Sequence, residues 1–132
     1  MTKTEHITYW QRQALDDWET ADVLYKGRKY LQSLFWLHLS IEKLCKALWI
    51  STNEGNAPPR THNLNRLLAE TDVDIPDDYA VLLTELNRFQ LEGRYPDYVS
   101  DAYKTVTNVL VEEYIERVNP LKAWLINLLP SN

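Results

Sequence analysis

Cysteine and glycine are scarce in this sequence. Because Cys45 is the one cysteine, no disulfide can form within the chain, and a zinc site built from several cysteines of this chain is excluded. The three glycines are too few for a β-sandwich with many tight turns or for a glycine-rich phosphate loop. These absences predict an all-helical fold in a reducing compartment.

Long apolar runs and an excess of basic charge are also missing. No stretch approaches the roughly 18 apolar residues of a membrane span, and the first residues, MTKTEHITYW, lack the apolar core of a signal peptide. We therefore expect a cytoplasmic protein without membrane contact. The net charge of −5 opposes strong non-specific attraction to nucleic acid, because affinity for phosphate backbones comes largely from Lys and Arg. A local basic cleft is compatible with this charge.

A long periodic stretch, Tyr30 to Ile50, dominates what is present. Its apolar residues recur every three or four positions and form one stripe of a helix: Leu34, Leu37, Ile41, Leu44 and Leu48. The neighbouring stripe is also largely apolar and consists of Phe35, His38, Glu42, Cys45 and Trp49. Water has access mainly at Gln32, Ser33, Ser40, Lys43 and Lys46. A helix with two apolar stripes is usually central in a bundle or shared with a partner, so we expect a homodimer.

The rest of the chain is consistent with one domain over residues 1–132. A first helix is expected from a cap at Thr2 or Thr4 to Gly27, and the short connector Gly27 to Lys29 forces the next helix to be antiparallel. Four carboxylates on this helix are interpreted as a solvated face: Asp16, Asp17, Glu19 and Asp22. A long loop then begins near Ser51.

Three further helices are expected after that loop. A brief one is capped by Thr61 or Asn63, another is capped by Asp77 and ended by Gly93, and the last begins near Tyr103. Pro120 either kinks the last helix or starts a new one, and the unbroken apolar phase around it favours the kink. The prediction is an all-α, antiparallel up-and-down bundle of about five helices.

Several polar residues could carry chemistry. His38 and Glu42, one helical turn apart, could form a metal pair, an acid/base couple or a hydrogen-bonded polar patch, of which the last is favoured. Lys43 and Lys46 face either a phosphate or solvent, with solvent favoured. His62 is either a helix-start residue with a satisfied ring or a ligand contact, and the first is favoured.

The turn that follows the predicted fourth helix has a different character. Arg94 is flanked by Tyr95, Pro96, Asp97 and Tyr98, which gives it a rigid setting with aromatic faces nearby. Its guanidinium could bind a phosphate through two hydrogen bonds. It could equally pair with Asp97 or Glu42 inside the protein.

Four features in order along the chain resemble the HEPN family (higher eukaryotes and prokaryotes nucleotide-binding domain). They are the Ala21 and Asp22 pair, the HxxxEKxxKAL run from His38 to Leu48, His62 with Leu64, and the run from Arg94 to Asp97. The resemblance implies a small helical bundle that usually dimerises. It also implies a nucleotidyltransferase encoded nearby as a partner, or a toxin or RNA-cleaving activity.

One departure from the family pattern bears on catalysis. The ribonuclease members look alike in one motif, an Arg separated from a His by four to six residues. Here the permitted positions after Arg94 are Val99, Ser100 and Asp101. Metal-free cleavage of RNA needs a group that moves a proton near neutral pH, and Val99 has none, while a solvated Asp with a pKa of about 4 is a weak base.

We therefore expect a non-catalytic protein that binds a nucleotide, RNA or a partner nucleotidyltransferase, as in a toxin-antitoxin-like pair. The predicted binding residues are Arg94, Tyr95, Asp97, His38, Glu42, Lys46 and His62, and no catalytic residue, metal or cofactor is expected. One alternative is a metal-independent ribonuclease toxin in which His38, His62 or Tyr98 assists Arg94. Another is a dimerisation module without a ligand.

Overall fold

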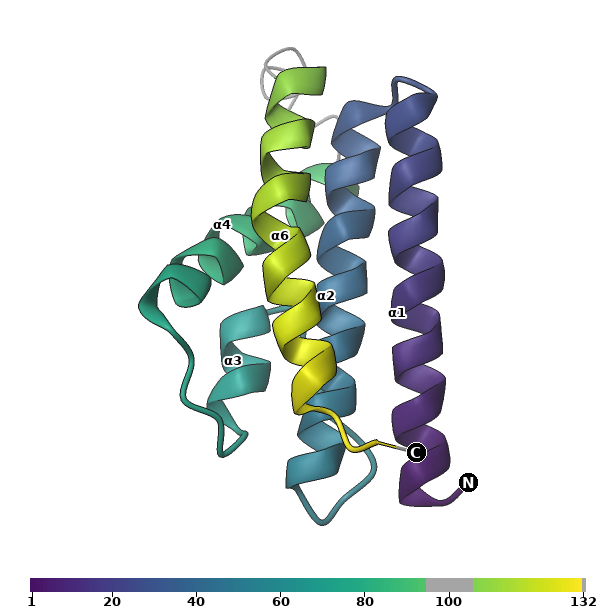
Figure 1. Ribbon diagram of the computed structural model, residues 1–132, viewed down its shortest axis with the longest axis vertical. Helices are drawn as coiled ribbons and strands as arrows, with labels where there is room; N and C mark the ends of the chain where they lie inside the picture. Colours follow the sequence, from purple (N-terminus) through teal and green to yellow (C-terminus); the bar gives the residue numbers. More distant parts are fainter. Residues whose placement is uncertain (95–105, 132) are drawn as a thin grey trace.

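The computed structural model describes residues 1–94 and 106–131, and the side chains of 1–90 and 106–131 (Figure 1). Within this part the chain forms five helices and no strand: α1 (Lys3–Lys26), α2 (Tyr30–Thr52), α3 (Leu64–Ala69), α4 (Asp77–Arg94) and α6 (Asn108–Leu128). The predicted all-α helical bundle is confirmed. Among the described helices, none is both long enough and apolar enough to cross a membrane.

Both ends of α1 are set by local hydrogen bonds. Thr2 is the cap: its Oγ1 accepts from the backbone N–H of Glu5 (3.1 Å), and the Glu5 carboxylate accepts from the N–H of Thr2 (3.3 Å). Gly27 ends the helix, as expected, and its N–H donates to the carbonyl of Val23. The next residue, Arg28, has a left-handed φ of 63°. This short turn places α2 antiparallel to α1 (Figure 1).

Small residues hold α1 and α2 together. Ser33 Oγ donates to the carbonyl of Ala21, and Ser40 Oγ donates to the carbonyl of Ala14; the donor–acceptor distance is 2.7 Å in both bonds. Both pairs repeat after seven residues on antiparallel helices, so they form one continuous seam. The prediction that Ser33 and Ser40 leave room for water is wrong. Both are fully buried, because each hydroxyl finds an acceptor on the facing backbone.

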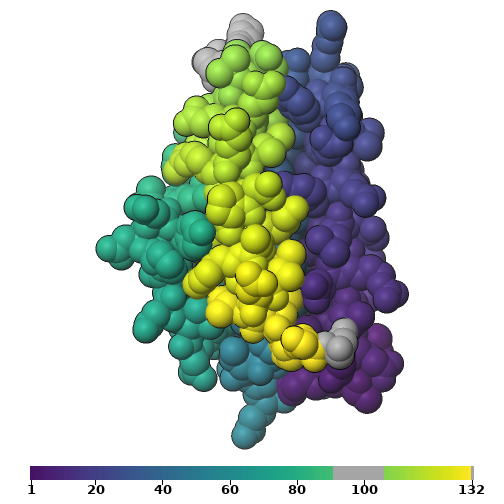
Figure 2. Space-filling model, viewed as in Figure 1, coloured from purple at the N-terminus to yellow at the C-terminus, as the bar shows by residue number. Residues whose placement is uncertain are grey.

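The main apolar stripe of α2 is the centre of the core. Its members, Leu34, Leu37, Ile41, Leu44 and Leu48, are at most 1% exposed. All four other described helices contact α2, and α6 lies over it in the space-filling view (Figure 2). One copy of the chain therefore buries this stripe by itself. The homodimer stays a prediction, without the support that an uncovered stripe would have given it.

The remaining helices differ from expectation mainly at their ends. Asn63 caps α3 by accepting from the N–H of Arg66 (3.2 Å). The expected cap of α4 at Asp77 and its expected end at Gly93 are each wrong by one residue, since the helix includes both and spans Asp77–Arg94. A glycine inside a helix costs only about 1 kcal/mol, which the rest of the helix can offset.

The last helix is continuous. Thr107 caps α6 by accepting from the N–H of Leu110 (3.3 Å), and the helix passes through Pro120 without a break. The exposed position of Pro120 and the buried Val118 and Leu121 beside it explain why core packing preserves the helix. Its expected start near Tyr103 lies outside the described residues.

Candidate functional site

Glu42 on α2 is the centre of a polar cluster. Its side chain is 4% exposed and accepts two hydrogen bonds, from Nδ1 of His62 (2.8 Å) and from Nζ of Lys46 (3.1 Å). Nδ1 of His38, one turn earlier, lies 3.9 Å from Glu42 Oε1. Four of the predicted site residues therefore meet at one place, where α2 faces the segment that leads into α3.

The hydrogen-bond partners identify one donor nitrogen on each histidine ring. Nε2 of His38 lies 2.9 Å from the backbone carbonyl of His62, which can only accept, so Nε2 carries a hydrogen. By the same reasoning, Nδ1 of His62 donates to Glu42. Burial lowers the pKa of His38 to about 4 against the opposing attraction of Glu42. His38 is therefore neutral at pH 7, and it ties α2 to the backbone ahead of α3.

His38 and Glu42 belong to one polar patch, but they do not bond each other as expected, since 3.9 Å separates Nδ1 from Oε1. His38 bonds the backbone of His62, and Glu42 bonds the side chains of His62 and Lys46. In the described part of the chain, no three His, Cys, Asp or Glu residues are placed to hold a metal ion. The favoured prediction that Lys46 faces solvent is wrong. Its side chain is 15% exposed, because the ammonium pairs with Glu42 and lies 5.2 Å from the ring centroid of Trp10.

A second ion pair corrects two further expectations. Asp17, assigned to a solvated acidic face, is 5% exposed, and its carboxylate lies 2.7 Å from Nζ of Lys43. Lys43 was expected to face solvent, but its side chain is only 20% exposed. Burial raises the pKa of Asp17, against the opposing effect of Lys43. This pair links α1 to α2 beside the Glu42 cluster.

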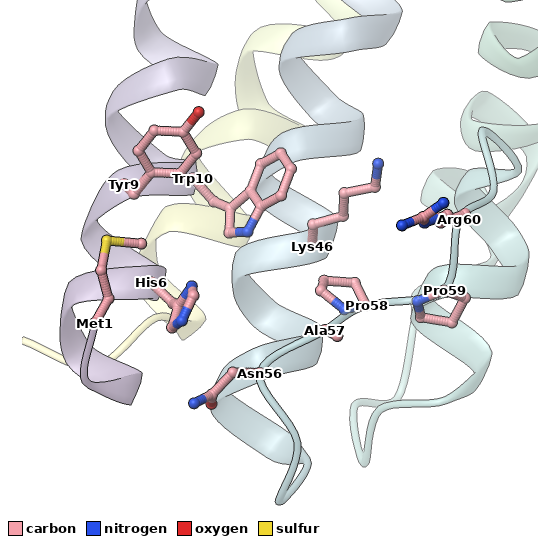
Figure 3. A pocket seen from close by; sticks show the side chains of 10 residues that line it. All are labelled: Met1, His6, Tyr9, Trp10, Lys46, Asn56, Ala57, Pro58, Pro59 and Arg60. Atoms are coloured by element: carbon pink, nitrogen blue, oxygen red, sulfur yellow. The ribbon is translucent and has the colours of Figure 1, made fainter.

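A hollow of about 410 Å³ opens on the other side of Lys46 (Figure 3). The start of α1, the C-terminal half of α2 and the loop after α2 line it. The lining residues are Met1, His6, Tyr9, Trp10, Lys46, Asn56, Ala57, Pro58, Pro59 and Arg60. Sequence reasoning missed this site except for Lys46. The adjacent aromatic pair Tyr9 and Trp10 and the proline pair before Arg60 were its only local signals.

Lys3 holds the loop wall of the hollow in place. Its ammonium contacts four oxygens: the backbone carbonyls of Ile50 (2.9 Å), Asn53 (2.8 Å) and Gly55 (3.0 Å), and Oδ1 of Asn56 (2.9 Å). A cation at the C-terminal end of α2 is also favoured by the helix dipole. The first turn of α1 is thereby fastened to the end of α2 and to the start of the loop.

Three of the predicted binding residues lie beyond the described side chains. Arg94 is the last residue of α4, and its side chain lies outside the described residues. Tyr95 and Asp97 also lie outside them. The predicted anion site at Arg94 and its possible pairing with Asp97 or Glu42 stay predictions.

Comparison with known proteins identifies the fold. The HEPN domain family matches residues 7–128, nearly the whole chain. The chain belongs to the HEPN family. No curated protein matches it. The crystal structure of TT1696 from Thermus thermophilus is similar, with a TM-score of 0.81 and 24% sequence identity over 93% of this chain and 98% of that chain. At this identity the likeness shows a shared fold.

Proposed function

We propose that this HEPN protein is a non-catalytic module that binds a nucleotide or RNA beside the Glu42 cluster. The observation that carries the proposal is a local reversal of charge. The whole chain has a net charge of −5, yet the charged side chains that line the hollow, Lys46 and Arg60, are both cationic, and no Asp or Glu is found among its described lining residues. Lys46 is paired with Glu42 behind the hollow, so Arg60 supplies the uncompensated charge. Cations beside aromatic side chains suit a phosphate-bearing ligand with bases that stack.

The Glu42 cluster supports this function by making the site rigid. The buried carboxylate fixes His62 and Lys46, and the His38 ring holds the backbone of His62. A site whose side chains are already ordered loses less conformational entropy when a ligand binds. The geometry therefore favours binding by a largely preformed surface.

Equilibrium binding to the full chain tests the proposal. Fluorescence anisotropy with short single-stranded RNA and calorimetry with mononucleotides should detect binding that weakens as salt is added, because cations contact phosphates. The RNA should be recovered intact after incubation without metal. If the chain binds neither RNA nor nucleotides, the proposal is overturned.

The same proposal includes protein partners suggested by the family. These are a second copy of the chain and a nucleotidyltransferase encoded nearby, in a toxin-antitoxin-like pair. Sedimentation equilibrium should give twice the 15.6 kDa mass of one chain. A mass that stays at 15.6 kDa at high protein concentration would contradict the dimer. Co-purification with the product of an adjacent nucleotidyltransferase gene tests the second partner.

A metal-independent ribonuclease is the alternative function, and one observation favours it. His62 is held by the Glu42 carboxylate through Nδ1, and its side chain is 44% exposed. This is the arrangement in which a carboxylate orients a histidine base. RNA cleavage by the wild-type chain in the presence of a chelator, lost in His62→Gln, would replace the binding proposal with the ribonuclease. Intact RNA under those conditions removes the alternative.

A further inference from the structure

We infer that the hollow binds one nucleoside monophosphate group, with its base against the wall at Trp10 and its phosphate at Arg60. The group would be either a free nucleotide or the phosphorylated end of an RNA chain. This inference rests on the proposed function and specifies the ligand of that site.

The wall formed by α1 is suited to a base. Trp10 is partly buried against the core, and the Tyr9 ring meets it edge to face with 5.6 Å between the ring centroids. These contacts hold the indole in place, while Ala57, Pro58 and Pro59 supply apolar surface from the loop. Aromatic side chains bind bases by stacking, and rigid apolar walls add to the affinity without a large loss of entropy.

The cations of the hollow are suited to a phosphate. Arg60 is exposed, and within the described residues its guanidinium has no hydrogen bond or ion pair. The ammonium of Lys46 donates to Glu42 and lies over the Trp10 ring, and because Lys46 also lines the hollow it adds positive charge there. Figure 3 shows the charged ends of Lys46 and Arg60 on the same side of the hollow. A guanidinium can hold two phosphate oxygens at once, and the ammonium adds a point charge.

The size of the hollow limits the ligand to a small one. Its volume of about 410 Å³ lies near the lower end of small-molecule sites, which span about 300–1,000 Å³. A single nucleotide is of this size, whereas a duplex would need an extended surface. The loop wall is fixed at both ends, by Lys3 at Gly55 and by Glu42 at His62. The site is therefore formed before the ligand arrives.

Three ligands test whether base and phosphate are both recognised. By calorimetry with the full chain, adenosine monophosphate should bind at least about 10-fold more tightly than adenosine or ribose 5-phosphate, because each of these lacks one of the two recognised parts. Equal binding of ribose 5-phosphate would mean a simple anion site. Equal binding of adenosine would mean an apolar site. Either result overturns the inference.

Two RNAs distinguish the two sources of the group. A short RNA with a 5′ phosphate and the same RNA with a 5′ hydroxyl are compared by anisotropy, each labelled at its 3′ end. An affinity that depends on the 5′ phosphate assigns the site to RNA ends. If only the mononucleotide responds, the ligand is a free nucleotide. Both outcomes support the inference.

A matched pair of variants ties the binding to the hollow. Arg60→Gln should weaken binding of adenosine monophosphate by about 10-fold, since a charge-assisted hydrogen-bond pair is lost. Arg66→Gln makes the same charge change on an exposed side chain of α3 that does not line the hollow, and it should bind like the wild type. Equal affinity of Arg60→Gln and wild type would overturn the inference.

The two proposals fail in different ways. If RNA binds but neither Arg60 nor a terminal phosphate matters, the inference about the hollow is wrong and the binding function stands. If the wild-type chain binds neither RNA nor any nucleotide, both are wrong. Because Arg60 is exposed, unchanged thermal unfolding of Arg60→Gln is expected and checks that the variant is folded.

Discussion

Two glutamates of this protein make similar contacts in different surroundings. Glu42 accepts from Lys46 and His62, and its side chain is 4% exposed. Glu85 on α4 accepts from the two terminal nitrogens of Arg117, Nη1 and Nη2, and from the hydroxyl of Tyr114, yet its side chain is 36% exposed. Both carboxylates connect segments that are distant in sequence. The difference between them is access to water.

Burial decides what each cluster contributes. Exposed ion pairs are screened by water and salt and contribute at most about 1 kcal/mol. A buried carboxylate has already lost its hydration, so its hydrogen-bond donors cannot be removed without a large penalty. The Glu42 cluster should therefore determine stability and the shape of the loop beside the hollow. The Glu85 cluster should only adjust how α4 and α6 pack.

The same substitution at the two glutamates is the strongest test of this difference. Glu42→Gln should lower the free energy of unfolding by about 2 to 3 kcal/mol, because the carboxamide turns an N–H group toward one of the two donors, Lys46 or His62. Glu85→Gln, the matched control, should cost less than about 1 kcal/mol. Urea unfolding at pH 7 measures both. Equal losses would show that burial does not distinguish the clusters.

The second prediction concerns pH: acid should destabilise the fold through the buried His38. The unfolded chain protonates His38 near its ordinary pKa of 6.5, while burial lowers the folded pKa to about 4. Between these values the unfolded state binds more protons, so stability falls as pH falls, by up to about 3 kcal/mol.

Variants isolate the contribution of His38 from other titrating groups. His38→Gln should flatten the decrease in unfolding free energy between pH 6.5 and 4. His6→Gln is the control, since this side chain on α1 is partly exposed, whereas His38 is fully buried. The raised pKa of Asp17 has the opposite effect on stability, because the folded chain takes up a proton at Asp17 more readily than the unfolded chain. This effect is the same in the wild type and in both variants. A slope unchanged in His38→Gln would assign the acid sensitivity elsewhere.

Local patterns in the sequence predicted the helices but not the partners of the charged groups. The stripe from Leu34 to Leu48 was correctly placed in the core, because helical periodicity depends on neighbours three and four residues away. The i, i+4 spacing of His38, Glu42 and Lys46 was also visible. The bond from His62 to Glu42 was not, since it joins positions 20 residues apart across a loop.

The wrong expectations for Asp17 and Lys43 share one cause. Asp17 and Lys43 were each assigned to solvent, as charged residues usually are, and each is protected by the other across 26 positions. The hollow was missed for the same reason: Trp10 and Arg60 come together only after α1, α2 and the loop have packed. Periodicity carries no information about contacts of this kind. Long-range pairing of polar groups therefore had to be read from the structure.

Lys3 separates the effect of burial from the effect of the number of partners. Its side chain is only partly buried, but its ammonium contacts four oxygens at the end of α2 and in the loop. Lys3→Met should lower the free energy of unfolding by about 1 to 2 kcal/mol and increase hydrogen exchange of the loop amides near Gly55. Lys26→Met, the control, removes an exposed pair with Asp22 and should change little. Identical exchange at Gly55 in both variants would contradict the proposed fastening.

The smallest expected effect, at Arg117, completes the comparison. Arg117 lowers the pKa of Glu85 through its hydrogen bonds, so the pair stabilises the fold above the ordinary pKa of 4.5. This contribution is lost as pH falls through the lower folded value. Because both side chains are more than one third exposed, Arg117→Gln should cost under about 1 kcal/mol at pH 7. The cost should shrink further in 1 M salt, where the Debye length is about 3 Å.

The loss in Glu42→Gln should persist at that salt concentration, because water and ions do not reach a buried carboxylate. Urea unfolding of both variants at low and high salt measures this, and a salt-sensitive loss at Glu42 would place that carboxylate in contact with solvent.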